Sequence, residues 1–422
     1  MDKFVIEGGN PLKGEVTISG SKNAALPILC SSILADTPCT YTNVPRLLDI
    51  ATIGKVLGTL GVKFQRISDD TVTVDPTRVT SWEAPYDLVK SMRASITVLG
   101  PLLAKYKEAK VSQPGGCAIG VRPIDLHLKA LAKMGADISL SHGYVMARVD
   151  GRLKGATIVF DKTTVGGTEN VLMAASLAEG TTVIQGAARE PEVVDLANAL
   201  IAMGARIEGA GESTVTIEGV KHLSGVNYRI IPDRIETGTF LVAGALTKGD
   251  IVIKGGRTDH VVAIIEKLAE MGLSIEALPD GSLRVNGEGE LKPVQVETVP
   301  YPGFPTDMQA QIMALACVVK GTSRITENIF ENRFMHVPEL VRMGGSLEEV
   351  GKTVIVQGVE QFQGASVMAT DLRASASLVL AALNARGYSE VRRIYHLDRG
   401  YEDLDRKLNA LGAQVRREKG GL

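Results

Sequence analysis

The feature that most constrains the fold is an internal repeat with a period of roughly 70 residues. A short amphipathic helix that ends in Gly and leads into an apolar strand occurs six times along the chain. Glycine is favoured where a helix ends because it adopts the left-handed backbone conformation without strain. The six copies are LGTLGVKF (57–64), LAKMGADI (131–138), LIAMGARI (200–207), LAEMGLSI (268–275), LVRMGGSL (340–347) and LNALGAQV (408–415).

A second, nearly all-round apolar helix precedes these segments, as in NAALPILCSSILA (23–35) and TGTFLVAGAL (237–246). A helix that is apolar on every face is expected to be buried. The repeating unit is therefore a buried helix, a strand, an amphipathic helix and two further strands. A helical solenoid is the alternative, but its repeats are about half as long and carry fewer strands. Because 422 residues exceed one ordinary core, we expect an α/β protein with two domains of three repeats each.

The two ends of the chain complement one another. Five repeats continue into an alternating strand, whereas the sixth runs out in RREKGGL. The chain begins with KFVIEGG (3–9), which is similar to the repeat strand TVTIEG (214–219). We therefore expect residues 3–8 to complete the last repeat. The first domain then spans 21–230, and the second combines 1–20 with 231–422 and contains both termini.

Composition narrows the class of protein. Apolar residues make up 45% and charged residues 22%, the balance of a globular protein. The net charge of -2 gives no general attraction to nucleic acid or to a membrane surface. The four cysteines and six histidines show no metal-ligand spacing, and no glycine-rich dinucleotide motif follows a strand. With neither a signal peptide nor a membrane span in sight, we expect a soluble cytoplasmic protein without metal, nicotinamide cofactor, nucleic-acid partner or membrane partner.

Two segments place charged residues at the start of buried helices. GSKNAALP (20–27) puts Lys22 and Asn23 where free backbone N–H groups and the helix dipole attract anions. The alternative is an ordinary surface lysine. YPGFPTDMQAQIMALA (301–316) puts Asp307 just before another such helix, where an N-cap role is a sufficient alternative.

QPGGCAIGVRPIDLH (113–127) carries a cysteine between glycines. Cys117 is thus expected on a loop rather than in a packed strand, and Arg122 could favour its thiolate. The surrounding Pro and Gly residues predict a lid that closes over a substrate. From these residues alone, both a catalytic and a non-catalytic loop cysteine remain possible.

These patterns together resemble the enolpyruvyl transferase family over the whole chain. That resemblance implies a two-domain inside-out α/β barrel, with three α/β repeats per domain around buried helices. It also implies chain crossings near Gly20 and Pro232 and an active site in the cleft between the domains. The motif PGGCxIGxRPxDLH resembles the loop of those members that use UDP-N-acetylglucosamine as acceptor; the shikimate-pathway members lack this cysteine loop.

The resemblance implies an activity and roles for particular residues. The enolpyruvyl group of phosphoenolpyruvate would pass to the 3-hydroxyl of UDP-N-acetylglucosamine through a tetrahedral ketal, with release of phosphate. By the same resemblance, this reaction would be the first committed step of peptidoglycan precursor synthesis, and the enzyme would be the target of fosfomycin. Cys117 would protonate the substrate or form an adduct with it, and Asp307 would be the base or would orient the sugar hydroxyl. The expected catalytic residues are Cys117, Asp307, Lys22 and Arg399.

Two sets of binding residues follow from the same resemblance. For phosphoenolpyruvate they are Lys22, Asn23, Cys117, Arg122, Asp371, Arg373 and Arg399. For UDP-N-acetylglucosamine they are Asn23, Arg93, Arg122, Pro123, Ile124, Asp125, Leu126, Lys162, Thr164, Val165, Gly166, Asp307 and Ile329. Thr164 stands where the family usually has Ser, and Thr likewise carries a hydroxyl group.

Three alternatives remain beside this interpretation. A shikimate 3-phosphate enolpyruvyl transferase or an RNA 3'-phosphate cyclase would share the fold, but the Cys117 loop and KTTVGG (162–167) argue against both. A non-catalytic repeat scaffold would not need basic residues at the starts of several buried helices. The oligomeric state stays open.

Overall fold

The computed structural model describes residues 2–90, 92–113 and 124–420, and its chain separates into two compact units. Among the described residues, 20–113 and 124–231 form the first unit, while 2–19 and 232–420 form the second. The described chain contains six four-stranded sheets. No helix in this part of the chain is both long and apolar enough to span a bilayer.

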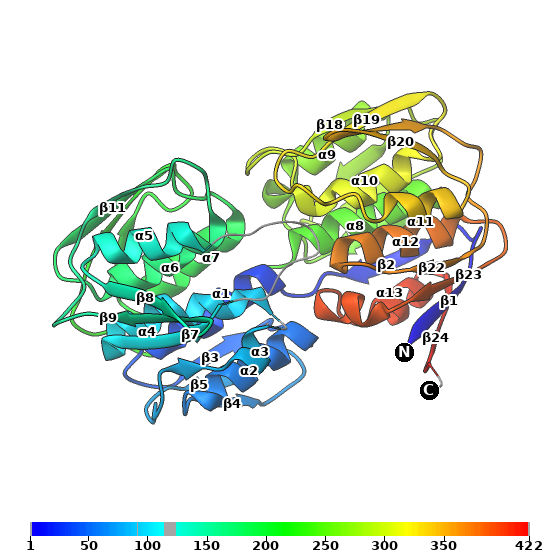
Figure 1. Cartoon of the computed structure of the whole chain (residues 1–422). Helices are drawn as coiled ribbons and strands as arrows, with labels where there is room; N and C mark the ends of the chain where they lie inside the picture. The colour runs from blue at the N-terminus through cyan, green and yellow to red at the C-terminus, as the bar shows by residue number, and fades with distance from the viewer. Residues whose placement is uncertain (1, 91, 114–123, 421–422) are drawn as a thin grey trace. The chain divides into compact units, whose positions relative to one another are not determined.

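The first unit carries the first three repeats, drawn from blue to green in Figure 1. Its helices are α1 (Lys22–Ser31), α2 (Leu48–Thr59), α3 (Tyr86–Val89), α4 (Leu99–Tyr106), α5 (Asp125–Lys133), α6 (Val165–Ser176) and α7 (Pro191–Ala202). Its strands are β3 (Cys39–Thr42), β4 (Lys63–Arg66), β5 (Val72–Asp75), β6 (Glu83–Ala84), β7 (Glu108–Ser112), β8 (Asp137–Ser141), β9 (Tyr144–Arg148), β10 (Thr157–Val159), β11 (Thr181–Gln185), β12 (Arg206–Glu208), β13 (Thr214–Glu218) and β14 (Asn227–Arg229).

The second unit carries the other three repeats and the N-terminal segment. Its helices are α8 (Arg234–Leu246), α9 (Val262–Glu270), α10 (Gln309–Ala316), α11 (Val337–Arg342), α12 (Leu372–Asn384) and α13 (Leu404–Ala410). Its strands are β1 (Lys3–Glu7), β2 (Lys13–Thr17), β15 (Asp250–Lys254), β16 (Ser274–Ala277), β17 (Leu283–Asn286), β18 (Gln295–Glu297), β19 (Thr322–Thr326), β20 (Ser346–Val350), β21 (Thr353–Gln357), β22 (Ser366–Met368), β23 (Tyr388–Arg392) and β24 (Gln414–Glu418).

All six sheets have the same internal order. In the sheet β10-β11-β13-β12, β10 runs parallel to β11, and the remaining pairs are antiparallel. The sheet β18-β19-β21-β20 repeats these directions in the second unit. The glycine that ends the amphipathic helix has a positive φ in every repeat. These angles are 91° at Gly61, 97° at Gly135, 109° at Gly204, 92° at Gly272, 91° at Gly344 and 93° at Gly412. The predicted sixfold repeat is therefore confirmed at the level of the backbone.

The N-terminal strand completes the last repeat, as its sequence predicts. β1 lies between β23 and β24 and is antiparallel to both, with Val5 opposite Glu390 on one side and Arg416 on the other. Figure 1 shows this blue strand beside the red C-terminal strands. The side chains of Phe4 and Ile6 are fully buried.

The apolar helices form the centre of each unit. In the second unit α8, α10 and α12 pack against one another, and every residue of α8 and α10 is buried. In the first unit α4 packs closely on α6, where a Cβ at Gly100 would lie 2.5 Å from the carbonyl oxygen of Asn170. The inner helices therefore begin at residues that are held firmly by the core, and several of the predicted site residues lie at these helix starts.

Candidate active site

Asp307 lies between two buried arginines in the second unit. It belongs to the short 3-10 helix η4 (Thr306–Met308), which leads directly into α10. Its Oδ1 accepts a hydrogen bond of 2.7 Å from Arg333 Nη2, and its Oδ2 accepts bonds of 3.1 and 2.9 Å from Arg373 Nε and Nη2. The arginine side chains are 7% and 4% exposed, whereas that of Asp307 is 26% exposed. The carboxylate therefore remains accessible while its charge is balanced from within the protein.

The two guanidinium groups determine the charge state of Asp307. Burial alone would raise the pKa of this carboxyl group, but Arg373 and Arg333 outweigh burial and hold the pKa well below its usual range. The N-cap alternative is wrong, because the caps of η4 and α10 are Pro305 and Met308, neither of which makes a side-chain capping bond. Asp307 is thus an ionised carboxylate whose two oxygens are both engaged.

Arg373 occupies the first turn of α12. Asp371 caps this helix, since its Oδ1 accepts bonds from the backbone N–H groups of Arg373 and Ala374 at 2.9 and 3.1 Å. The Nη1 atom of Arg373 is buried and has no hydrogen-bond partner among the described residues. A buried guanidinium N–H without an acceptor is costly, so this atom is a candidate donor to a bound anion.

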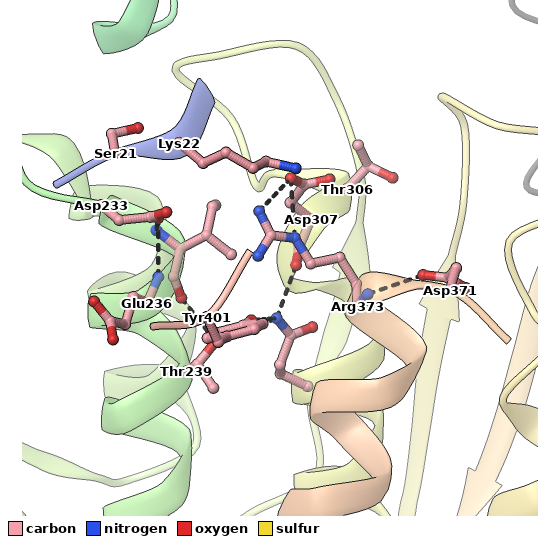
Figure 2. A network of polar contacts seen from close by, with 12 residues as sticks. Ser21, Lys22, Asp233, Glu236, Thr239, Thr306, Asp307, Asp371, Arg373 and Tyr401 are labelled. Carbon is pink, nitrogen blue, oxygen red and sulfur yellow. Dashed lines mark hydrogen bonds and ion pairs between the residues drawn. The ribbon is translucent and has the colours of Figure 1, made fainter. Parts of the chain in front are cut away.

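A polar network connects the starts of the three inner helices of the second unit (Figure 2). The Arg373 guanidinium lies 5.5 Å from the ring centre of Tyr401, whose hydroxyl is 2.9 Å from Thr239 Oγ1 on α8. Gln311 Nε2 on α10 donates to the backbone oxygen of Asp307 at 2.9 Å. These contacts fix Asp307 and Arg373 relative to the helices that carry them.

Arg399 ends the 3-10 helix η5 (Ile394–Arg399) and is partly buried. Burial, followed by the positive charge of Arg399, lowers the pKa of the His396 imidazole.

Lys22 begins α1 in the first unit. Ser21 caps this helix with its hydroxyl, which accepts a bond from Ala24 N at 3.3 Å, and Asn23 is partly buried in the first turn. Lys22 Nζ lies 3.2 Å from Asp49 Oδ2 on α2, and these side chains are only 12% and 5% exposed. The surface-lysine alternative is therefore wrong, and Asp49 is a partner that sequence reasoning missed.

Several of the residues predicted to bind the nucleotide sugar lie at two adjacent helix starts in the first unit. Thr164 caps α6 by accepting a bond from Gly167 N at 3.2 Å, and Val165 and Gly166 form the first turn. A Cβ at Gly166 would lie 3.0 Å from the ring of His127, so the starts of α5 and α6 are neighbours. Two helix N-termini side by side provide N–H groups and positive dipole ends for phosphate groups. The other predicted residues near these starts are Ile124, Asp125, Leu126 and the exposed Lys162.

His127 is held as a neutral imidazole of one tautomer. Asn170 Oδ1 accepts a bond from Gly100 N at 2.8 Å, so its Nδ2 is the donor to His127 Nδ1, also at 2.8 Å. The proton of the neutral ring therefore lies on Nε2. Burial, followed by the charge of Arg93 at the start of η2 (Arg93–Val98), lowers the pKa of His127 to about 4.

Comparison with known proteins decides the family. A family model described as EPSP synthase (3-phosphoshikimate 1-carboxyvinyltransferase) matches residues 6–408. The chain is 59% identical over 418 residues to a UDP-N-acetylglucosamine 1-carboxyvinyltransferase of Nitratidesulfovibrio vulgaris (strain DP4), covering 99% of this chain and 100% of the relative. It is 57% identical over 424 residues to the protein of that name in Anaeromyxobacter dehalogenans (strain 2CP-C), covering 100% of both. The chain belongs to the enolpyruvyl transferase family.

The likeness extends to a solved structure of another enolpyruvyl transferase. NikO from Streptomyces tendae is described as an enolpyruvyl transferase, and its structure matches with a TM-score of 0.89 at 28% identity, over 100% of this chain and 99% of NikO. The predicted fold class, the inside-out α/β barrel of two domains, is therefore confirmed.

The remaining predicted residues of this enolpyruvyl transferase divide into two groups. Ile329 is partly buried in the loop after β19, and its N–H donates to Glu327 Oε1 at 2.8 Å. Cys117, Arg122 and Pro123 lie outside the described residues. Among the described residues, no group of three or more Asp, Glu, His or Cys side chains is arranged to hold a metal ion.

Sequence reasoning missed three residues: Arg333 in the second unit, which binds Asp307, and Asn170 and Asp49 in the first, which bind His127 and Lys22. Arg333 lies four residues after the predicted site residue Ile329, and Asn170 lies four residues after Gly166, so both are close in sequence to predicted residues. Asp49 is the one charged residue in the apolar run LLDIATI (47–53), a signal that could have been used. Their roles depend on partners far away in the sequence.

Proposed function

We propose that this enolpyruvyl transferase moves the enolpyruvyl group of phosphoenolpyruvate to the 3-hydroxyl of UDP-N-acetylglucosamine and releases phosphate. The observation that supports this most is the full-length similarity, at 59% and 57% identity, to proteins named UDP-N-acetylglucosamine 1-carboxyvinyltransferase. That name specifies both the acceptor and the group that is transferred. With this assignment the reaction is the first committed step of peptidoglycan precursor synthesis, and we propose that the enzyme is cytoplasmic.

The buried arginines suit the anionic donor. Phosphoenolpyruvate carries a phosphate and a carboxylate, and guanidinium groups bind both through paired N–H donors. Arg373 offers its buried Nη1, which has no hydrogen-bond partner among the described residues. We propose that it acts together with Lys22, Arg122 and Arg399, assisted by Asn23 and Asp371. A substrate oxygen that draws Arg373 away from Asp307 would also release Oδ2 of that carboxylate.

The chemical steps then follow from proton transfers at two groups. Cys117 gives a proton to the methylene carbon, which becomes a methyl group and leaves an oxocarbenium-like C2. The sugar 3-hydroxyl oxygen bonds to C2 while its proton passes to Asp307. The Cys117 thiolate then takes back a proton from the methyl group while the C2–O bond to phosphate breaks, which restores the double bond and releases phosphate. An acid and a base positioned in this way each contribute about 10²- to 10⁴-fold.

Asp307 has the properties that this role needs in the transition state. Its low pKa makes it a weak base toward a neutral alcohol, but it stays ionised over the physiological range. As the 3-hydroxyl attacks the cationic C2, that hydroxyl becomes strongly acidic, and the carboxylate accepts its proton late. The proposed contacts to the nucleotide sugar are Asn23, Arg93, Arg122, Pro123, Ile124, Asp125, Leu126, Lys162, Thr164, Val165, Gly166, Asp307 and Ile329.

Phosphate release tests the proposal. The enzyme is incubated with phosphoenolpyruvate and either UDP-N-acetylglucosamine, shikimate 3-phosphate or no acceptor, and inorganic phosphate is measured. Release is expected only with UDP-N-acetylglucosamine. The second candidate acceptor is shikimate 3-phosphate, because the matching family model is described by that activity. Release with the shikimate acceptor alone would overturn the proposal in favour of this candidate.

A further inference from the structure

Glu327 is a buried carboxylate that the proposed chemistry does not use. It follows β19 and is 2% exposed. Its Oε1 accepts bonds from Thr298 Oγ1 at 2.8 Å and from the backbone N–H groups of Ile329 and Phe330 at 2.8 and 3.1 Å. Its Oε2 accepts a bond from Thr306 Oγ1 at 2.8 Å. Four donors from three segments of the chain therefore converge on one side chain.

Thr306 connects Glu327 to Arg333 through its hydroxyl group. Its hydroxyl donates its single proton to Glu327 and accepts a bond from Arg333 Nη1 at 2.7 Å. A carboxylate can only accept and a guanidinium can only donate, so the direction of both bonds is fixed. The guanidinium is also placed by Phe330, whose ring centre lies 5.1 Å from it.

The same guanidinium holds the reactive carboxylate. Arg333 Nη1 is bound by Thr306, while its Nη2 reaches Asp307 Oδ1 at 2.7 Å. The chain of contacts thus runs from Glu327 through Thr306 and Arg333 to Asp307.

We infer that Thr306 and Glu327 are positioning residues for the transfer step, which act through Arg333 to keep Asp307 Oδ1 fixed while Oδ2 is offered to the sugar hydroxyl. Glu327 also places Ile329, through its backbone N–H, at an expected contact to the nucleotide sugar. The inference rests on the proposed function, since it concerns the residue that receives the proton. A purely structural role for the two residues would alter stability without a selective effect on turnover.

Substitution of Thr306 tests this directly. Thr306→Val keeps the shape but removes the hydroxyl, so the Arg333 guanidinium loses one of its two described hydrogen-bonding partners. We expect kcat to fall on the order of 10- to 100-fold, the size of effect that misplacement of a catalytic group produces. The KM for UDP-N-acetylglucosamine should change by less than about 3-fold, because the groups that bind the substrate remain. Thr306→Ser keeps the hydroxyl and should restore kcat to within about 3-fold of the wild type.

Glu327→Gln gives a second, independent variant. The amide oxygen can still accept the three bonds made to Oε1, but the amide nitrogen donates to Thr306 Oγ1 and cannot accept from it. A loss of kcat like that of Thr306→Val is therefore expected. Thr322→Val is the matched control, because its hydroxyl donates only to Gln357 at an exposed position on β19; its kcat should equal that of the wild type.

The outcomes separate the two proposals. If wild-type enzyme releases no phosphate with UDP-N-acetylglucosamine, the proposed function fails. If the wild type is active and Thr306→Val or Glu327→Gln retains its kcat, the positioning role is wrong. It is equally wrong if Thr306→Ser is as impaired as Thr306→Val, or if the loss lies wholly in KM. Should Thr306→Val not fold, the kcat of Glu327→Gln decides.

Discussion

At the scale of single residues, the cysteines differ sharply in their expected reactivity. Cys30, Cys39 and Cys317 are fully buried, and burial raises the pKa of all three thiols, to about 12 for Cys30 and Cys317. A thiol that stays protonated and inaccessible reacts poorly with electrophiles. These three residues are therefore poor candidates for alkylation.

We accordingly expect the epoxide fosfomycin, an electrophilic mimic of phosphoenolpyruvate, to alkylate Cys117. UDP-N-acetylglucosamine should accelerate the reaction if it orders the lid predicted around this residue. Peptide mass mapping identifies the modified cysteine, and a label on any of the other three would show that Cys117 is not the reactive residue. Cys117→Asp should keep more turnover than Cys117→Ala and should resist the label, because a carboxylic acid can still donate a proton.

Arg399 provides a second test at this scale. A charge-assisted hydrogen bond to an anion contributes about 1.5–3 kcal/mol. Arg399→Ala should therefore raise the KM for phosphoenolpyruvate by roughly 10- to 100-fold, or lower kcat/KM by that factor. Arg392→Ala is the control, because its side chain is 57% exposed and paired with Glu390. Wild-type kinetics in Arg399→Ala would remove Arg399 from the proposed anion site.

The site residues show what a sequence can predict and what it cannot. Asp307 and Arg373 each stand at the start of an apolar helix, and such a local pattern is visible in the sequence. Arg333 binds Asp307 from 26 residues away, and Asp49 binds Lys22 from 27 residues away. No local periodicity encodes such a pair. The N-cap interpretation of Asp307 failed for the same reason, since two distant arginines compete successfully for its oxygens.

At the scale of elements, β1 offers the clearest test. It is the third strand of the sheet β22-β23-β1-β24, and Ile6 points into the core of the second unit. Ile6→Ala should lower the free energy of unfolding by about 2–5 kcal/mol, the usual cost of such a truncation in a core. Val5→Ala, on the opposite face of the same strand, is the matched control and should cost much less. Urea-induced unfolding measures both, and equal losses would contradict the inward orientation of Ile6.

The fold was more accessible from the sequence than the site. The six helix-ending glycines and the missing strand of the last repeat are local patterns that recur, so each copy supports the others. The pairing of β14 with β3 had no such signal, although it joins the end of the first unit to its beginning. It depends on closure of the unit as a whole, which a repeat pattern does not reveal.

At the scale of the whole molecule, three histidines link stability to pH: His127 and His336 are buried and His260 is partly buried. Burial lowers the pKa of His127, His260 and His336 to about 4 in the folded protein. In the unfolded chain the pKa of these imidazoles is about 6.5. Above that pH they are neutral in both states. As the pH falls below it, the unfolded chain binds protons that the folded protein does not, and stability is lost until the pH reaches the folded pKa.

We therefore expect His336→Asn to weaken the dependence of stability on pH. At pH 5 each such histidine should cost on the order of 2 kcal/mol relative to pH 7, from 1.36 kcal/mol per pH unit. Glu169 acts with the opposite sign, because burial and then Glu192 raise the pKa of its carboxyl group. The free energy of unfolding is measured in urea for the variant and the wild type at pH 5 and pH 7. Because both proteins contain Glu169, its contribution cancels when their pH dependences are compared. The exposed His142→Asn is the control, since it should lose as much stability as the wild type between pH 7 and pH 5. If His336→Asn loses just as much, His336 does not exclude its proton in the folded protein.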